Sequence, residues 1–191
     1  MIDDSWPWKR DLEKAAVDLE RRRTQRRWSE ASWGKLERVL LGGAFAVRKL
    51  LDSGKISDEV ESMTIKAQAF PPKARRVDRL NRHRLEQLYD LNAPRAVDVG
   101  LQRFCNQLVH SFVLSPAYEP GLGLLGLFVS SDRDRERRCL YFAVEAIIEV
   151  FNAIATDDIV YFESRRSEIG AEMRIVRKSN RLPAEVGLIP S

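Results

Sequence analysis

Apolar residues recur at every third or fourth position in five segments of this chain, and this spacing limits the fold more than any other feature. Trp8, Leu12 and Leu19 begin the pattern. Such spacing places apolar side chains on one face of a helix. Helices are predicted over roughly residues 5–27, 29–54, 77–91, 94–112 and 144–155. We therefore expect a mainly α fold, a single-domain bundle of about five helices.

A β-hairpin interrupts the helical pattern. Two apolar runs, Leu127–Val129 and Cys139–Phe142, flank the charged stretch 131–138, which is typical of two strands joined by a turn. The hairpin is expected near residues 125–143, inserted before the last helix.

Three further segments are ambiguous. Residues 63–69 alternate apolar and polar side chains, which favours a short strand, whereas residues 57–59 just before them resemble a helix start. Residues 159–162 and 173–176 fit either strands or parts of a helix.

The composition is that of a folded domain. Hydrophobic residues make up 44% of the chain and charged residues 31%, which is enough to bury a core. We expect residues 1–180 to form a single mainly helical domain and residues 181–191 a loosely ordered tail. No apolar stretch approaches the roughly 18 residues of a membrane span, and the N-terminus lacks the apolar core of a signal peptide. A cytoplasmic protein without membrane contact is therefore expected.

The cysteines and glycines indicate no cofactor. Cys105 and Cys139 are the only cysteines, and neither has the spacing of a metal site, so buried thiols are expected. Residues 121–126 have the spacing GxGxxG, but the alternation of strands and helices that a dinucleotide site needs is absent. Neither a metal nor another cofactor is predicted.

Basic residues gather in the first half of the chain. Residues 1–95 carry 21 Lys and Arg against 15 Asp and Glu, which can attract polyanions such as nucleic acid. The candidate nucleic-acid-binding side chains are Arg21, Arg22, Arg23, Arg26, Arg27, Arg75, Arg76, Arg79 and Arg82. For residues 21–27 a solvated helix face, helped by the helix C-terminal dipole, is favoured over a phosphate-binding patch. Arginine makes up 24 of the 32 basic residues, which also fits a GC-rich genome.

The aromatic residues and the first histidine favour structural roles. All four tryptophans, including Trp28 and Trp33, lie in the first 33 residues. Packing in the core or between helices is favoured for them over base stacking. His83, surrounded by arginines, is interpreted as an exposed residue.

One predicted helix carries residues suited to catalysis. Arg103, Asn106 and His110 are three and seven residues apart, so they lie along one side of the helix over residues 94–112. An imidazole can move protons near neutral pH, and a guanidinium can stabilise charge on phosphate oxygens. Together they are suited to splitting a phosphodiester without a metal. The alternative is that His110 and Asn106 form a buried polar pair that bridges to the hairpin.

The spacing of Arg103 and His110, with six residues between them, resembles the R-x(4–6)-H motif of HEPN domains. The resemblance implies a helical bundle, a metal-independent ribonuclease or a degenerate relative of one, and an active site shared with a second protomer. Residues 105–112, with residues 130–133 and 140–141, also resemble a group of uncharacterised bacterial proteins, which supplies no activity.

Two functions are therefore carried forward. The first is a HEPN-like, RNA-cleaving protein that uses Arg103, Asn106 and His110. The second is a non-enzymatic module that binds nucleic acid, a protein partner or a second copy of itself through its basic helical faces.

Overall fold

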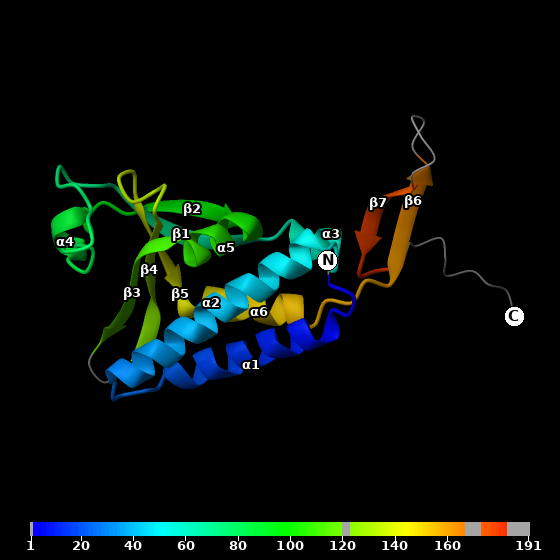
Figure 1. The fold of residues 1–191 in the computed structure, drawn as a ribbon, viewed down its shortest axis with the longest axis horizontal. Coiled ribbons are helices and arrows are strands. Elements are labelled where there is room, and N and C mark those ends of the chain that lie inside the picture. Colours follow the sequence, from blue (N-terminus) through cyan, green and yellow to red (C-terminus); the bar gives the residue numbers. More distant parts are fainter. Residues whose placement is uncertain (1, 120–122, 167–172, 183–191) are drawn as a thin grey trace, which may run out of the picture.

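A computed structural model of the protein describes residues 2–119, 123–166 and 173–182 (Figure 1). The helices in this part of the chain are α1 Trp6–Arg22, α2 Glu30–Asp52, α3 Asp58–Glu61, α4 Leu85–Leu88, α5 Leu101–Val109 and α6 Val144–Ala155. The strands are β1 Thr64–Phe70, β2 Arg95–Gly100, β3 Ser111–Glu119, β4 Gly123–Ser131, β5 Cys139–Ala143, β6 Tyr161–Arg166 and β7 Met173–Ser179.

Five strands form one antiparallel sheet in the order β2-β1-β5-β4-β3. β4 and β5 are the predicted hairpin, in register with Phe128 opposite Tyr141. β6 and β7 form a separate two-stranded sheet beside α3. The prediction of a mainly helical bundle is therefore wrong, and the fold is a mixture of helices and sheet. It also differs from the helical bundle that the HEPN resemblance implies.

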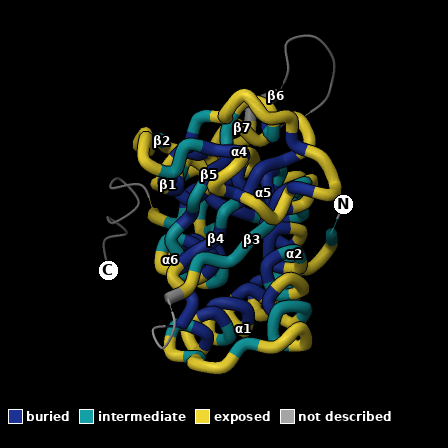
Figure 2. Tube along the Cα trace, turned by 90° about the vertical axis from the view of Figure 1, so that its left-hand side faces the viewer, coloured by how far each residue is buried: buried dark blue, intermediate teal, exposed yellow. Residues whose placement is uncertain are grey.

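Helices cover one face of the large sheet. Side chains alternate between the two faces of a strand, and Leu140 and Phe142 of β5 point to the side where α5 and α6 pack. The helical hairpin α1–α2 lies outside α5 and α6 and shares the same core (Figure 1). Buried positions in Figure 2 accordingly follow the inner sides of α1 and α2, and exposed positions follow their outer sides.

An irregular segment covers the opposite face of the sheet. Cys139 belongs to this face, where it forms a second apolar cluster with Val77, Leu85, Leu88 and Tyr89. A long helix over residues 77–91 was the prediction, and it is wrong except for the single turn of α4. This segment consists mostly of turns, and its apolar side chains are spaced so that they contact the sheet.

The predicted helix over residues 94–112 is also wrong at both ends. β2 occupies its first part, because Val97, Asp98 and Val99 alternate in side-chain type and residues 95–100 pair with β1. Pairing across a sheet is decided by distant residues, which a local helical spacing does not report. β3 begins at Ser111 and continues through Pro116, a residue that a sheet tolerates because β3 is its edge strand.

Most of the remaining local predictions are confirmed in the described residues. α2, α6, β1 and the β4–β5 hairpin lie where the sequence places them. α1 begins as predicted but ends at Arg22, so its predicted continuation to residue 27 is wrong. The side-chain oxygen of Ser29 caps α2 by accepting a hydrogen bond from the Ser32 amide at 3.2 Å, and Gly54 ends the helix with a φ of +62°. The ambiguous segments near 160 and 175 are the strands β6 and β7. Residues 183–191 of the predicted tail lie outside the described part.

No helix in the described residues is long and apolar enough to cross a membrane. Both cysteines are free and buried.

Two neighbouring glycines of α2 give a test of this packing. A Cβ on Gly43 would run into the ring of Phe151 on α6, whereas a Cβ on Gly42 would meet nothing within 4 Å. Gly43→Ala is expected to lower the free energy of unfolding by about 1–3 kcal/mol through overpacking. Gly42→Ala is expected to raise it by about 0.5–1 kcal/mol, because alanine favours helix. Chemical denaturation of the two variants checks the opposite signs, and a shared sign would contradict the packing of α2 against α6.

Candidate functional site

A cavity of about 700 Å³ lies where the C-terminal end of α5 meets α2 and the turn between β4 and β5. We call it the arginine pocket, because four arginines line it. Its lining residues are Arg48, Arg103, Asn106, Gln107, His110, Ser131, Asp132, Arg133, Asp134 and Arg137. Four arginines against two aspartates give the pocket a formal charge of +2 with a neutral histidine.

The amphipathic pattern of α5 directs its polar residues into this pocket. The apolar side of the helix is buried against the sheet and α2 through Leu101, Phe104, Cys105 and Leu108. Arg103, Asn106 and His110 occupy the other side, as their spacing predicts, and all three line the pocket. The structure therefore brings the three candidate catalytic residues together.

His110 is exposed at the C-terminal cap of α5. Its amide donates to the Asn106 carbonyl oxygen at 3.1 Å, and its carbonyl oxygen accepts from the Asp132 amide at 3.1 Å. These backbone bonds hold the residue in place, while its imidazole makes no hydrogen bond within the described residues. The interpretation of His110 as part of a buried polar pair is therefore wrong.

Gln107 has the bridging role that the sequence suggested for His110. This buried side chain accepts from the Ser131 amide at 2.9 Å and donates to Asp134 Oδ2 at 2.8 Å. Asp134 in turn binds Arg103 at 3.3 Å and Arg138 at 3.5 Å. The network ties the hairpin turn to α5 and orients the Arg103 guanidinium. The sequence contained one signal for this role: Gln107 is a polar residue directly before Leu108, among the apolar positions of the predicted helix.

Three arginines of the pocket were not predicted. Arg48 comes from α2 and donates to the Asn106 side-chain oxygen across the pocket. Arg133 and Arg137 belong to the charged turn, where both are exposed and form no ion pair within the described residues. The charged turn was visible in the sequence, but its position beside α5 depends on the pairing of β3 with β4.

The first predicted arginine cluster is partly structural. Arg22 is buried, and its Nε atom lies 2.6 Å from an oxygen of Asp18. Arg23 pairs with Glu20 and with Glu145 of α6 at 2.8 and 2.9 Å. The remaining members of the cluster are exposed: Arg21, Arg26 and Arg27.

The second predicted cluster lies in the segment before α4, well apart from the first (Figure 1). Arg75 donates to Gln87 at 2.8 Å, and Arg82 donates to the Phe112 carbonyl oxygen at 3.3 Å. Arg76 and Arg79 are exposed. No predicted nucleic-acid-binding arginine lines the arginine pocket, although Arg82 lines another cavity.

The thiols are poor candidates for chemistry. Burial raises the pKa of both Cys105 and Cys139 to about 12, so both stay protonated near neutral pH and are weak nucleophiles. The described residues contain no group of three or more His, Cys, Asp or Glu side chains placed to hold a metal ion.

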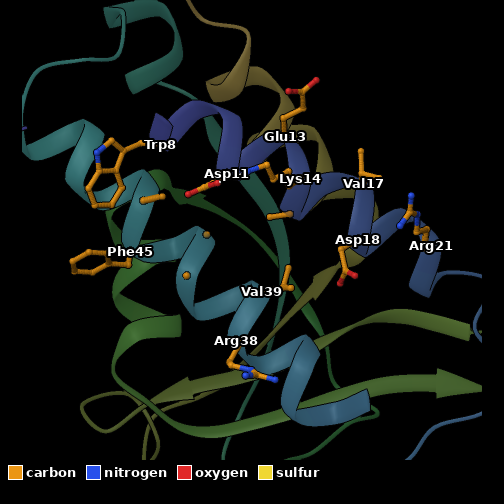
Figure 3. A pocket seen from close by; sticks show the side chains of 14 residues that line it. Trp8, Asp11, Glu13, Lys14, Val17, Asp18, Arg21, Arg38, Val39 and Phe45 are labelled. Carbon is orange, nitrogen blue, oxygen red and sulfur yellow. Dashed lines mark hydrogen bonds and ion pairs between the residues drawn. The ribbon is translucent and has the colours of Figure 1, made fainter. Parts of the chain in front are cut away.

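A larger cavity of about 800 Å³ lies between α1 and α2 on the outer surface (Figure 3). Apolar side chains such as Trp8, Val39 and Phe45 line it, and the nearby Asp11 is already paired with Lys14 at 2.9 Å. In Figure 3 Asp18 and Arg21 lie on α1 and Arg38 on α2, away from Trp8 and Phe45, and Asp18 is already paired with Arg22 at 2.6 Å. Catalysis needs polar groups that converge on one point, so the smaller arginine pocket is the better candidate site.

The arrangement in the arginine pocket is suited to a phosphorylated ligand. Guanidinium groups can bind phosphate oxygens through paired hydrogen bonds, and an exposed imidazole beside them can give or take a proton.

No family model, curated protein or solved structure matches this chain.

Proposed function

We propose that the arginine pocket binds the phosphates of single-stranded RNA and that the protein cleaves the RNA backbone there without a metal cofactor. One observation carries the proposal: the His110 imidazole is exposed beside four guanidinium groups and has no hydrogen-bond partner within the described residues. Because the imidazole is exposed and its ring nitrogens are not used by the fold, it is free to exchange a proton with a ligand bound in the pocket.

The arginines have separate roles in this proposal. Arg133 and Arg137 are free of ion pairs within the described residues, so they can contact phosphates at little cost in lost interactions. Arg103 is held by Asp134, and Arg48 is held by Asn106, so both present their guanidinium groups in fixed positions. Such preorganised charge stabilises the negative charge that develops on a phosphate during reaction.

His110 is proposed as the proton donor. The ribose 2′ hydroxyl attacks the adjacent phosphorus and releases its proton to solvent. The imidazolium of His110 gives a proton to the departing 5′ oxygen, and the products are a 2′,3′-cyclic phosphate and a 5′ hydroxyl. The reaction needs the 2′ hydroxyl, so RNA rather than DNA is the proposed substrate.

The HEPN-like part of the proposal is limited to the site. It rests on the spacing of Arg103 and His110, which lie on one side of α5. A second copy of the chain is the proposed partner, because the motif resembles one that is shared between protomers. We also propose a cytosolic location, since both thiols are free.

A non-enzymatic RNA-binding module is the second candidate. The exposed side chains Arg26, Arg27, Arg76 and Arg79 favour it, because they can bind phosphates without any catalytic group nearby. Under this alternative the arginine pocket contributes little to affinity.

Binding of an RNA that resists cleavage separates the two candidates. With a labelled 2′-O-methyl oligonucleotide, Arg103→Ala is expected to weaken binding roughly tenfold, as for the loss of one charged hydrogen bond. Four phosphate contacts also predict that a fourfold rise in salt weakens wild-type binding roughly 50-fold. Fluorescence anisotropy measures both effects.

Arg95→Ala is the matched control, because Arg95 is an exposed arginine of the edge strand β2 and lies outside the pocket. Arg95→Ala should bind the 2′-O-methyl oligonucleotide with the affinity of the wild type. Unchanged affinity for Arg103→Ala, with loss of binding for Arg26→Ala and Arg27→Ala, would contradict the proposed site and support the second candidate.

A further inference from the structure

A second cavity, of about 420 Å³, lies beside β3. Ser111, which directly follows His110, lines it. We call it the tryptophan cavity, and its lining residues are Trp33, Glu37, Arg82, His83, Ser111, Phe112, Leu114, Ser115 and Pro116. It takes side chains from α2, from the segment before α4 and from β3.

The same two parts of the chain border both cavities: α2, and the stretch that runs from the end of α5 into β3. From His110 to Leu114 the chain advances four residues, or about 13 Å at the rise of a strand. α2 borders both cavities, with Arg48 in one and Glu37 in the other, about 16 Å apart along the helix axis. A single strand of nucleic acid is long and flexible enough to enter both.

The tryptophan cavity differs from its neighbour in charge. It contains one arginine and one glutamate, so with a neutral histidine its formal charge is zero, against +2 in the arginine pocket. A phosphate group has little reason to prefer the neutral cavity. An uncharged part of the same ligand fits it better.

Its side chains are those that recognise a flat, polar-edged ring. Trp33 and Phe112 are half-buried. One face of the Phe112 ring is covered by the Arg135 guanidinium, whose carbon lies 4.0 Å from the ring centre, so Trp33 is the candidate stacking surface. Aromatic faces stack on unpaired bases. The Glu37 carboxylate can accept a hydrogen bond from an exocyclic amino group, and the hydroxyl of Ser115 can both donate and accept one.

We propose that the tryptophan cavity binds an unpaired nucleobase of the same RNA whose phosphate lies in the arginine pocket. The inference rests on the proposed function, and it adds a base-binding subsite to the phosphate-binding one. Trp33 stacks on the base, and Glu37 favours bases that carry an amino group over uracil. The tryptophan therefore has two roles, since it also packs against the core from the outside.

The test uses two probes that share a backbone. One is a labelled 2′-O-methyl oligoadenosine, and the other is an abasic phosphodiester of the same length. Trp33→Leu keeps an apolar side chain against the core but removes the stacking surface. It is expected to weaken binding of the oligoadenosine roughly tenfold and to leave binding of the abasic probe unchanged.

His83→Ala is the second variant, because His83 is exposed and its loss should not affect folding. Because its imidazole lines the tryptophan cavity, its loss is expected to remove a contact with the base and to weaken binding of the oligoadenosine alone, by a smaller factor. If both variants bind both probes like the wild type, or lose affinity for the two probes equally, no base occupies the tryptophan cavity.

Arg103→Ala separates this inference from the function on which it rests. It should weaken binding of both probes, because both carry phosphates. If it does so while Trp33→Leu and His83→Ala change nothing, the base subsite is wrong and the phosphate site stands. If Arg103→Ala changes neither affinity, the proposed function fails, and the base subsite fails with it.

Discussion

His110→Ala is expected to reduce RNA cleavage by roughly 100-fold or more while the melting temperature stays unchanged. The loss follows from removal of the proton donor for the departing 5′ oxygen. The stability is retained because the side chain is exposed and its imidazole makes no hydrogen bond within the described residues. Gel analysis of a labelled RNA, together with a thermal melt, measures both quantities on the same preparation.

The double variant with Arg103→Ala sharpens this test. Two residues that act on one phosphate have effects that do not add, so the double variant should be little slower than His110→Ala alone. Arg95→Ala should cleave at the wild-type rate, and EDTA should not inhibit, because guanidinium groups supply the positive charge. If His110→Ala cleaves RNA at the wild-type rate, or if the wild-type protein does not cleave RNA, the proposed catalysis is wrong and the pocket is at most a binding site.

Asp157→Ala is expected to lower the free energy of unfolding by about 3 kcal/mol. Asp157 is buried just after α6, and its carboxylate accepts from the Ser57 amide and hydroxyl, each at 2.7 Å, and from Asn180 at 3.1 Å. Alanine leaves these donors without a partner in a region shielded from water. The bonds also join the start of α3 to the chain after β7, so their loss should loosen the small sheet.

Asp158 provides the matched control for this stability prediction. Its side chain is 90% exposed, and its ion pair with Lys9 spans 3.6 Å. The Asp158 carboxylate is solvated, and the buried Lys9 also donates to the Asp157 carbonyl oxygen, so Asp158→Ala should change the free energy of unfolding by less than about 0.5 kcal/mol. Urea denaturation of both variants gives the comparison. Equal effects at the two positions would mean that the buried bonds of Asp157 do not stabilise the fold.

The sequence predicted elements whose signal is local. The apolar stripes of α1, α2 and α6 and the two runs of the β4–β5 hairpin are strong patterns within one element. β2 and β3 were missed because their identity as strands depends on pairing with β1 and β4, which lie elsewhere in the chain. Local spacing cannot report such pairing, and the prediction of a helical bundle failed for this reason.

The same distinction between local and distant signals applies to the residues of the site. Arg103, Asn106 and His110 could be found because α5 and its C-terminal cap carry all three, and helical spacing places them on one side. Arg48 lies 58 residues before Asn106, and only the tertiary fold brings them into contact. A polar side chain such as Gln107 among apolar neighbours signals a buried hydrogen bond, but the sequence does not identify its partner.

The charge of the arginine pocket has a consequence for folding itself. Four guanidinium groups gathered around one cavity repel each other, and two aspartates offset only part of that repulsion. We therefore expect an anion bound in the pocket to offset this repulsion. By mass action, a ligand that binds only the native state stabilises it. If the proposed RNA binds here, the protein's stability is expected to rise with the RNA concentration.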